Sequence, residues 1–151
     1  MRKFLVILDN STECLNAMRF AAMRAEKTGA CVAVLAVIPP EEFNHWIGVG
    51  EVMREEARDR INAHFEIFGK WMRDNHKVDP ELVIREGKIV TEILAQIKED
   101  QEVDILVLGA SIDRKGPGPI VTQLSKASGS SEVPIVIVPG SLSKEQLEAI
   151  V

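Results

Sequence analysis

The sequence predicts an α/β domain: a doubly wound, five-stranded parallel sheet flanked by helices, in the manner of a Rossmann-like α/β/α sandwich. Five short apolar runs alternate with segments whose apolar residues recur at helical spacing. The central runs are apolar at nearly every position, as expected for strands that are covered on both faces. Parallel strands need right-handed crossovers, so helices are expected on both sides of the sheet.

The first half of the chain supplies two strands and two helices. Residues 3–8 form the first strand, and Ser11 or Thr12 is expected to cap a helix that runs to Lys27, just before Gly29. Residues 31–38 form the second strand, which ends at Pro39-Pro40 because proline cannot continue a ladder. A charged helix follows from about Glu51 to His76, with one buried stripe made of Ile61, Phe65, Phe68 and Met72.

The second half supplies three strands and three helices. Strands are predicted over 81–85, 103–108 and 134–138, and helices over 89–100 and 120–127. Glu86-Gly87 forms a turn after the third strand. The segment from Ser143 to Gln146 has the spacing of a capping box and predicts a final helix through Ile150.

Composition limits the class of protein. The chain has 151 residues, 46% of them hydrophobic and 27% charged, which predicts one globular domain over 1–151. A net charge of −5 with dispersed basic residues argues against a nucleic-acid surface. No apolar run approaches the roughly 20 residues of a membrane span, so a cytoplasmic protein is expected. Cys14 and Cys31 have no metal-ligand spacing and are expected to be free thiols, and no metal site is predicted.

Asp9 follows the first strand directly, at the edge where α/β proteins bind ligands. A carboxylate there can accept a ribose hydroxyl, coordinate a metal or be phosphorylated. An equally good interpretation is that Asp9 or Ser11 only caps the first helix, because Asp and Ser are both preferred at that position. The residues alone leave these alternatives open.

A glycine-rich loop follows the fourth strand, from Gly109 to Thr122. A glycine turn that leads into a helix N-terminus presents backbone N–H groups to an anion. Pro117 and Pro119 lack an N–H, so two donors are missing. The spacing matches neither a Walker A loop nor GxGxxG, and hydrolysis or dinucleotide redox chemistry has no support. Phosphate binding and a rigid connecting loop remain equal alternatives.

Other polar and aromatic features have simpler explanations. The loop over 41–50 carries Phe43, His45 and Trp46, which could fold over a ligand but more often pack against a sheet edge or a partner. His64 and His76 are isolated in a charged helix and have no nearby nucleophile. The mixed charges at the start of that helix are most simply a solvated face: Glu51, Arg54, Glu55, Glu56, Arg58 and Arg60.

In their order and spacing, several segments together make the chain resemble the universal stress protein family over nearly its whole length. They are Val6-Ile-Leu-Asp9-Asn-Ser11, Val34-Leu-Ala-Val37-Ile, the Glu86-Gly87 turn, Glu92-Ile-Leu94, Val103-Asp-Ile-Leu-Val-Leu-Gly109-Ala-Ser111 and Val133-Pro-Ile-Val-Ile-Val138. The family that the chain resembles has two branches, one whose members bind ATP and one whose members do not.

Members that bind ATP carry Gly-x2-Gly-x9-Gly-(Ser/Thr) after the fourth strand. Here Gly109 matches the first glycine, Ile112 replaces the second, and Val121 stands near the third, followed by Thr122. A side chain at position 112 is expected to block the close approach of a triphosphate to the backbone. The resemblance therefore implies a non-enzymatic stress-response protein with a degenerate loop and little or no ATP binding.

The alternative is an adenine-nucleotide sensor that binds ATP or AMP with magnesium. By resemblance, Asp9 would lie near the ribose and Val37 near adenine. The candidate nucleotide-binding residues are Asp9, Val37, Gly109, Ser111, Gly118 and Thr122.

The resemblance also implies a homodimer formed through the last strand. Without a partner, the apolar residues of that strand would leave a hydrophobic edge exposed. The residues expected at this interface are Ile135, Val136, Ile137 and Val138. Further protein partners are expected for a protein of the interaction type, but their identity does not follow from the sequence.

Overall fold

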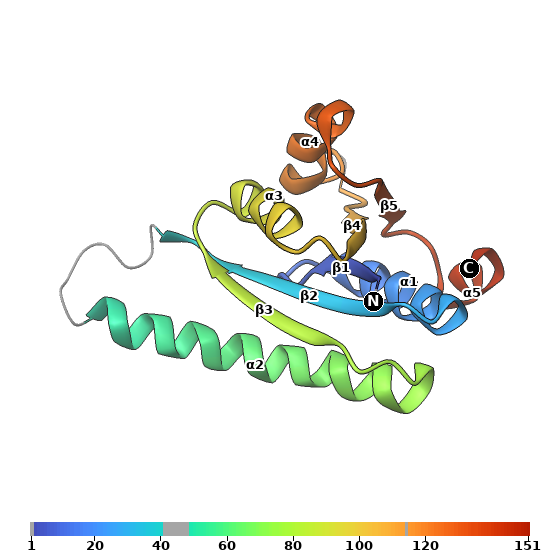
Figure 1. Cartoon of the computed structure of the whole chain (residues 1–151), viewed down its shortest axis with the longest axis horizontal. Coiled ribbons are helices and arrows are strands. Elements are labelled where there is room, and N and C mark those ends of the chain that lie inside the picture. Colours follow the sequence, from blue (N-terminus) through green and yellow to red (C-terminus); the bar gives the residue numbers. More distant parts are fainter. Residues whose placement is uncertain (1, 41–48, 114) are drawn as a thin grey trace.

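The computed structural model describes residues 2–40, 49–113 and 115–151, and it confirms the predicted fold class. Five parallel strands form one sheet in the order β3-β2-β1-β4-β5, with helices on both faces (Figure 1). The aromatic part of the predicted 41–50 loop, with Phe43, His45 and Trp46, lies outside the described residues.

The observed elements lie close to the predicted ones. The strands are β1 (Lys3–Ile7), β2 (Cys31–Ile38), β3 (Glu81–Glu86), β4 (Val103–Ala110) and β5 (Ile135–Pro139). The helices are α1 (Cys14–Thr28), α2 (Val49–His76), α3 (Ile89–Glu99), α4 (Pro119–Lys126) and α5 (Lys144–Ile150). The fourth strand is longer than predicted, because Gly109 and Ala110 still pair with Val138 and Pro139 of β5.

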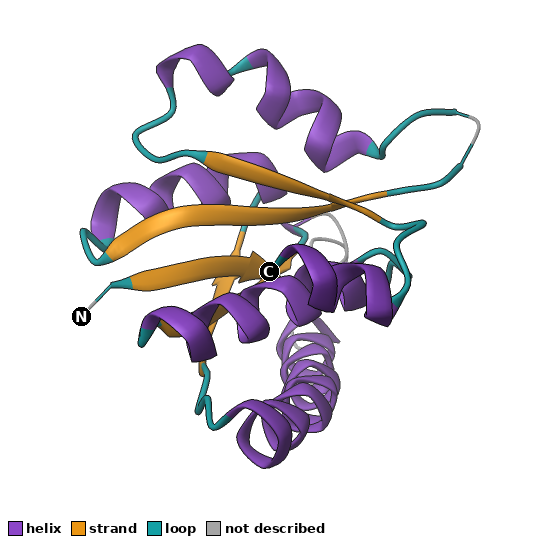
Figure 2. Ribbon diagram, turned by 90° about the vertical axis from the view of Figure 1, so that its right-hand side faces the viewer, coloured by secondary structure: helices purple, strands orange, loops and turns teal. Residues whose placement is uncertain are grey.

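The strand order reverses between β1 and β4. β1 pairs with β2 on one side and with β4 on the other, so that Val6 lies opposite both Val34 and Val107. From this point the chain builds outward to β3 in one direction and to β5 in the other (Figure 1), and helices lie on both sides of the strands (Figure 2). The crevice at such a reversal is the usual ligand site of open α/β sheets.

Two hydrophobic cores lie on the two faces of the sheet. Alternate strand residues such as Val6 and Val34 pack with α1, α2 and α5, and the intervening residues such as Leu5 and Leu35 pack with α3 and α4. All four of these side chains are fully buried. The near-continuous apolar character of β1 and β2 thus has the cause that the sequence suggested, namely cover on both faces.

The helix ends confirm two predictions and contradict a third. Gly29 ends α1 in the left-handed conformation, and Ser143 with Gln146 forms the capping box of α5. The N-cap of α1 is Glu13, and no side chain caps it. The prediction that Ser11 or Thr12 caps α1, and the interpretation of Asp9 as a cap, are therefore wrong. The Ser11 hydroxyl and backbone N–H bond to Asp9 instead.

Candidate functional site

Asp9 and Gly109 lie at the reversal point of the sheet. Asp9 Oδ1 accepts hydrogen bonds from the Ser11 backbone N–H at 2.9 Å and from the Ser11 hydroxyl at 2.5 Å. These two bonds hold the Asp9 carboxylate in one orientation. Within the described residues the other oxygen, Oδ2, makes no hydrogen bond, so it can accept one from a ligand hydroxyl.

The larger hollow at this edge has a volume of about 380 Å³. This is within the range of roughly 300–1,000 Å³ that is usual for small-molecule sites. Its walls come from the ends of β1 and β2, from one face of α2 and from the start of α3. The lining residues are Leu8, Asp9, Asn10, Ala36, Val37, Ile38, Pro39, Ala57, Arg60, Ile61, His64 and Ile89. Mostly apolar walls with a few polar groups suit a flat, partly apolar ligand such as a nucleoside.

The smaller hollow lies between β1, β4 and the start of α4, and its volume is only about 20 Å³. A single water needs roughly 10–15 Å³ on this measure. Asp9, Ser11, Glu13, Gly109 and Ile120 are among its lining residues. In this arrangement the hollow has room for little more than one water.

Gly109 is required here because the backbone of α1 comes very close to it. A Cβ on Gly109 would lie 2.2 Å from the Glu13 carbonyl oxygen. The Glu13 side chain points towards the glycine-rich loop, and its Oε1 lies 3.9 Å from the position of a Cβ on Gly118. Gly118 precedes α4, so an acidic group lies beside the helix N-terminus that would otherwise attract an anion.

The loop between β4 and α4 uses many of its own backbone donors. The Ser111 N–H donates to the Pro117 carbonyl at 3.0 Å, and the Gly116 N–H donates to the Asp113 carbonyl at 3.1 Å. The Asp113 N–H donates to the Ser111 hydroxyl, and the Lys115 N–H donates to the Asp113 carboxylate. Pro117 and Pro119 have no N–H to offer. These four N–H groups are therefore not free to cradle a phosphate.

Ile112 lies outside both hollows. Its side chain is 74% exposed and lines neither hollow. Its Cγ2 instead lies near Gly140, which follows β5. The expectation that Ile112 excludes a triphosphate by its bulk stays a prediction. Four N–H groups of the loop donate within the loop, the Glu13 carboxylate lies beside Gly118, and the hollow beside Gly109 is small.

The structure brings together only some of the predicted site residues. Asp9 and Val37 line the larger hollow, and Asp9 and Gly109 line the smaller one. Ser111, Gly118 and Thr122 line neither of them. The Thr122 hydroxyl donates to the Gly118 carbonyl at 2.8 Å, within the first turn of α4. The predicted residues after β1 and in β2, Asp9 and Val37, therefore line an open hollow. The predicted residues Ser111 and Thr122, which follow β4, instead form hydrogen bonds within their own loop and helix.

Two residues of the larger hollow were missed from the sequence. Arg60 was assigned to a solvated helix face and His64 was regarded as an isolated histidine, yet both line the hollow together with Ala57 and Ile61. Their positions, 57, 60, 61 and 64, follow the i, i+3, i+4, i+7 pattern of one helix face. This spacing was visible in the sequence. What could not be read there was that this face of α2 lies against the ends of β1 and β2.

Cys14 lies beside the smaller hollow but is chemically quiet. Its thiol donates to the Ile7 carbonyl at 3.4 Å, and burial raises its pKa to about 12. The thiol is therefore protonated at neutral pH and is a poor nucleophile. Within residues 2–40, 49–113 and 115–151, no group of three or more His, Cys, Asp or Glu side chains is placed to hold a metal ion.

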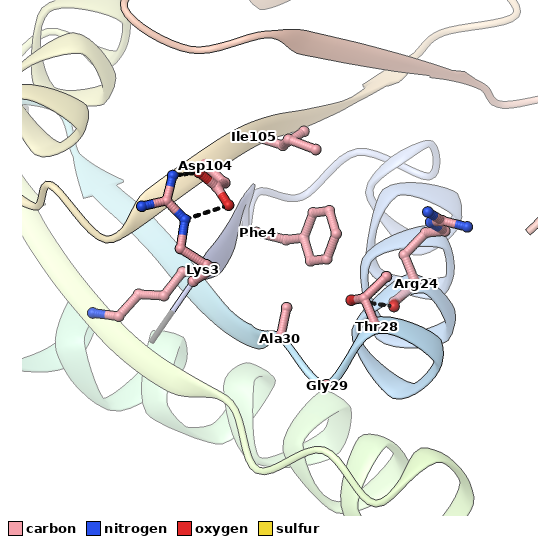
Figure 3. Close-up of a pocket in the computed structure, with 9 residues that line it drawn as sticks. Lys3, Phe4, Arg24, Thr28, Gly29, Ala30, Asp104 and Ile105 are labelled. Carbon is pink, nitrogen blue, oxygen red and sulfur yellow. Dashed lines mark hydrogen bonds and ion pairs between the residues drawn. The ribbon is translucent and has the colours of Figure 1, made fainter.

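Another hollow, of about 330 Å³, lies at the amino ends of β1 and β4 (Figure 3). The Phe4 ring and Ile105 form its apolar part, and the end of α1 forms its rim. The Arg2 guanidinium is paired with Asp104, and the Thr28 hydroxyl donates to the Arg24 carbonyl. These polar groups satisfy one another. The hollow also lies at the edge opposite the carboxyl ends of the strands, away from Asp9.

β5 is an edge strand of the sheet, since it pairs with β4 alone. Ile135 and Val136 are partly buried, Ile137 is 44% exposed and Val138 is buried. The predicted dimer-interface residues thus include one well-exposed apolar side chain on an edge strand.

No helix of the described chain is both long and apolar enough to span a membrane.

The fold and site together define a class of α/β protein with a hollow of small-molecule size beside the carboxyl ends of β1 and β2. A sequence profile of the universal stress protein family matches residues 1–139. The chain belongs to the universal stress protein family.

Solved structures share this fold at low sequence identity. The universal stress protein UspA from Lactobacillus plantarum is 16% identical, with a TM-score of 0.75 and 91% of this chain and 97% of that chain covered. A universal stress protein solved in complex with cAMP is 18% identical, with a TM-score of 0.65 and coverage of 93% and 98%. A universal stress protein from Archaeoglobus fulgidus solved in complex with dAMP is 15% identical, with a TM-score of 0.60 and coverage of 91% and 98%. A search of the curated proteins found no match.

Proposed function

We propose that this universal stress protein is a non-enzymatic stress-response protein that binds an adenine nucleoside or nucleoside monophosphate in the larger hollow. The two further phosphates of a triphosphate add little to its affinity. The observation that supports this is the contrast between the two hollows that share Asp9. The one beside Val37 has a volume of about 380 Å³, and the one beside Gly109 about 20 Å³.

The contacts of the nucleoside follow from the chemistry of the larger hollow. The Asp9 carboxylate, held by Ser11, accepts a ribose hydroxyl, and Val37 and Ile38 offer an apolar surface to the base. Two of the relatives with this fold were solved with adenine monophosphates, cAMP in one case and dAMP in the other. Their ligands fit the size of this hollow better than that of the crevice beside Gly109.

Calorimetric titration of the purified protein with adenosine, AMP, ADP and ATP, each with and without magnesium, tests the proposal. We expect adenosine and AMP to bind, and ATP to bind no more tightly than AMP. Asp9→Asn, which keeps an oxygen for the Ser11 N–H, should weaken adenosine binding by about tenfold or more, since a charge-assisted hydrogen bond is lost. Asp59→Asn, an exposed acid on α2, should leave it unchanged. ATP binding at least tenfold tighter than AMP binding would overturn the proposal, as would phosphate release from ATP.

A homodimer through β5 belongs to the same proposal. The exposed Ile137 side chain lies on an edge strand whose backbone groups are unpaired on one side, and a second copy can cover both. The molar mass in light scattering tests this association directly. A monomer at all accessible concentrations would exclude it, without bearing on nucleotide binding.

A further inference from the structure

We infer that Arg60 forms an anion subsite on α2, and that this subsite binds the phosphate monoester of a nucleoside monophosphate in place of the glycine-rich loop. The assignment rests on the proposed function, because Arg60 can act in this way only if the larger hollow holds a nucleoside. It adds the position and the chemistry of the phosphate contact.

The first observation is the position of Arg60. It lines the larger hollow from α2, across from Asp9 and Asn10 at the end of β1. His64, one turn further along the same helix face, also lines the hollow, and the centroid of its ring lies 5.2 Å from the centroid of the Phe68 ring. A ligand whose ribose meets Asp9 therefore has cationic and hydrogen-bonding side chains on the wall formed by α2.

The second observation is the charge balance along α2. Arg54 and Arg58 both pair with Glu86, and Arg73 pairs with Glu66 and Asp79. Arg60 has no ion-pair partner among the residues that the structure describes. A guanidinium that lines a hollow without a carboxylate partner is available to an anion, and its planar fork fits two phosphate oxygens at once.

The third observation is the state of the glycine-rich loop. Four of its N–H groups donate within the loop, and the Glu13 carboxylate lies beside Gly118. The loop therefore offers a phosphate few donors and an adjacent negative charge. Arg60 offers a positive charge in the hollow that also contains Asp9. The balance of charge favours the α2 wall for the phosphate.

Binding of adenosine and AMP to the wild type, Arg60→Gln and Arg58→Gln tests the inference. Arg58 is the matched control, because it lies on the same helix but pairs with Glu86 outside the hollow. We expect AMP to bind the wild type roughly tenfold or more tightly than adenosine, as a charge-assisted pair implies. Arg60→Gln should remove that advantage, so that AMP binds this variant no more tightly than adenosine does. Arg58→Gln should keep it, and Arg60→Lys should restore part of it.

The outcomes separate the two proposals. If adenosine and AMP bind, but Arg60→Gln keeps the AMP advantage, the subsite is wrong and the proposed function stands. If neither adenosine nor AMP binds the wild type, the proposed function fails, and the subsite fails with it. NMR of the arginine Nε–Hε groups during titration with AMP tests the subsite directly. The Arg60 signal is the one that is absent from the spectrum of Arg60→Gln. A shift of this signal on addition of AMP supports the subsite, and an unshifted signal overturns it.

Discussion

The carbonyl oxygen of Glu13 lies only 2.2 Å from the point that a Cβ on Gly109 would occupy. The start of α1 thus packs directly on the end of β4, and this contact sets the width of the crevice at the reversal of the sheet. The same residue, Glu13, sends its carboxylate towards Gly118. One short segment therefore both requires a glycine in β4 and places an acid at the start of α4.

Gly109→Ala should destabilise the fold, because α1 or β4 must move to admit the methyl group. We expect a loss of about 1–3 kcal/mol in the free energy of unfolding, typical of overpacking. Urea denaturation monitored by circular dichroism measures it. The control is Gly129→Ala, where a Cβ meets nothing within 4 Å. Equal stability of the two variants would show that this close contact is not present in solution.

Glu13→Gln should increase the affinity for ATP. The substitution removes a negative charge beside Gly118 and keeps the size of the side chain. Relief of one partly solvated like-charge contact is worth roughly 1 kcal/mol, or about fivefold in affinity. The comparison of ATP with adenosine by calorimetry measures the effect, since adenosine binding should not change. Glu145→Gln in α5 serves as the control, and an unaltered ATP affinity in Glu13→Gln would contradict the role given to this carboxylate.

Ser11→Ala should weaken nucleoside binding through Asp9. The variant removes the hydroxyl that donates to Asp9 Oδ1, while the backbone N–H of residue 11 can still donate. We expect adenosine affinity to fall by roughly three- to tenfold, the worth of an ordinary hydrogen bond, because the backbone N–H still holds Asp9 in part. The melting temperature, recorded alongside, separates this effect from unfolding. Full affinity in a folded variant would mean that Ser11 does not orient Asp9.

The stability of the fold should fall in acid through the pair of Lys3 and Asp100. Lys3 Nζ lies 2.7 Å from Asp100 Oδ2, and this hydrogen bond lowers the Asp100 pKa below its ordinary value of 3.8. The unfolded chain then binds a proton more readily than the folded one. The pair therefore stabilises the fold above pH 3.8, and this contribution is lost as the pH falls towards the lower pKa of the folded state.

Lys3→Met should reduce that acid dependence and cost about 1–3 kcal/mol at neutral pH, since Asp100 loses its charged partner and keeps the hydrogen bond from the Glu102 N–H. Urea unfolding of both proteins between neutral pH and about pH 3 measures the two slopes. Lys70→Met is the control, because its pair with Asp74 is largely exposed. A variant whose acid slope equals that of the wild type would show that the pair contributes nothing.

Ile137→Lys should convert a β5-mediated dimer into a monomer. A lysine on an edge strand opposes pairing with a second copy, because its charge would be buried at the interface. Light scattering on the wild type and the variant gives the molar mass of each. Ile67→Lys, at an isoleucine on α2 that is more exposed than Ile137, should leave the mass unchanged. A variant that stays dimeric would place the interface elsewhere.

Most of the fold could be predicted because its signals are local. Apolar runs such as 31–38, the left-handed Gly29 and the capping box at Ser143 each report on their own neighbourhood. The position of Asp9 and Val37 at one edge followed from the rule for parallel strands. The predicted cap of α1 failed because Ser11 has a competing partner, Asp9, two residues away.

The site was harder to predict because it depends on contacts between distant segments. Ile112 replaces a glycine of the pattern, yet its side chain points to solvent near Gly140, and no local rule gives that direction. Arg60 and Arg58 look alike in the sequence. Only one of them lines the hollow, because α2 lies on the sheet with one particular face inward.

The amino-acid sequence by itself determined the α/β class, the order of the elements, the universal stress protein family and the placement of Asp9 at a strand end. Periodicity and turn residues are sufficient for these, since they act within a few positions. Only the tertiary structure decided that the crevice beside Gly109 is narrow and that the hollow beside Val37 is open. The volume and charge of a site depend on segments that are far apart in the chain, such as Glu13 with Gly118 and Arg60 with Asp9. These properties therefore arise only once the segments have packed together.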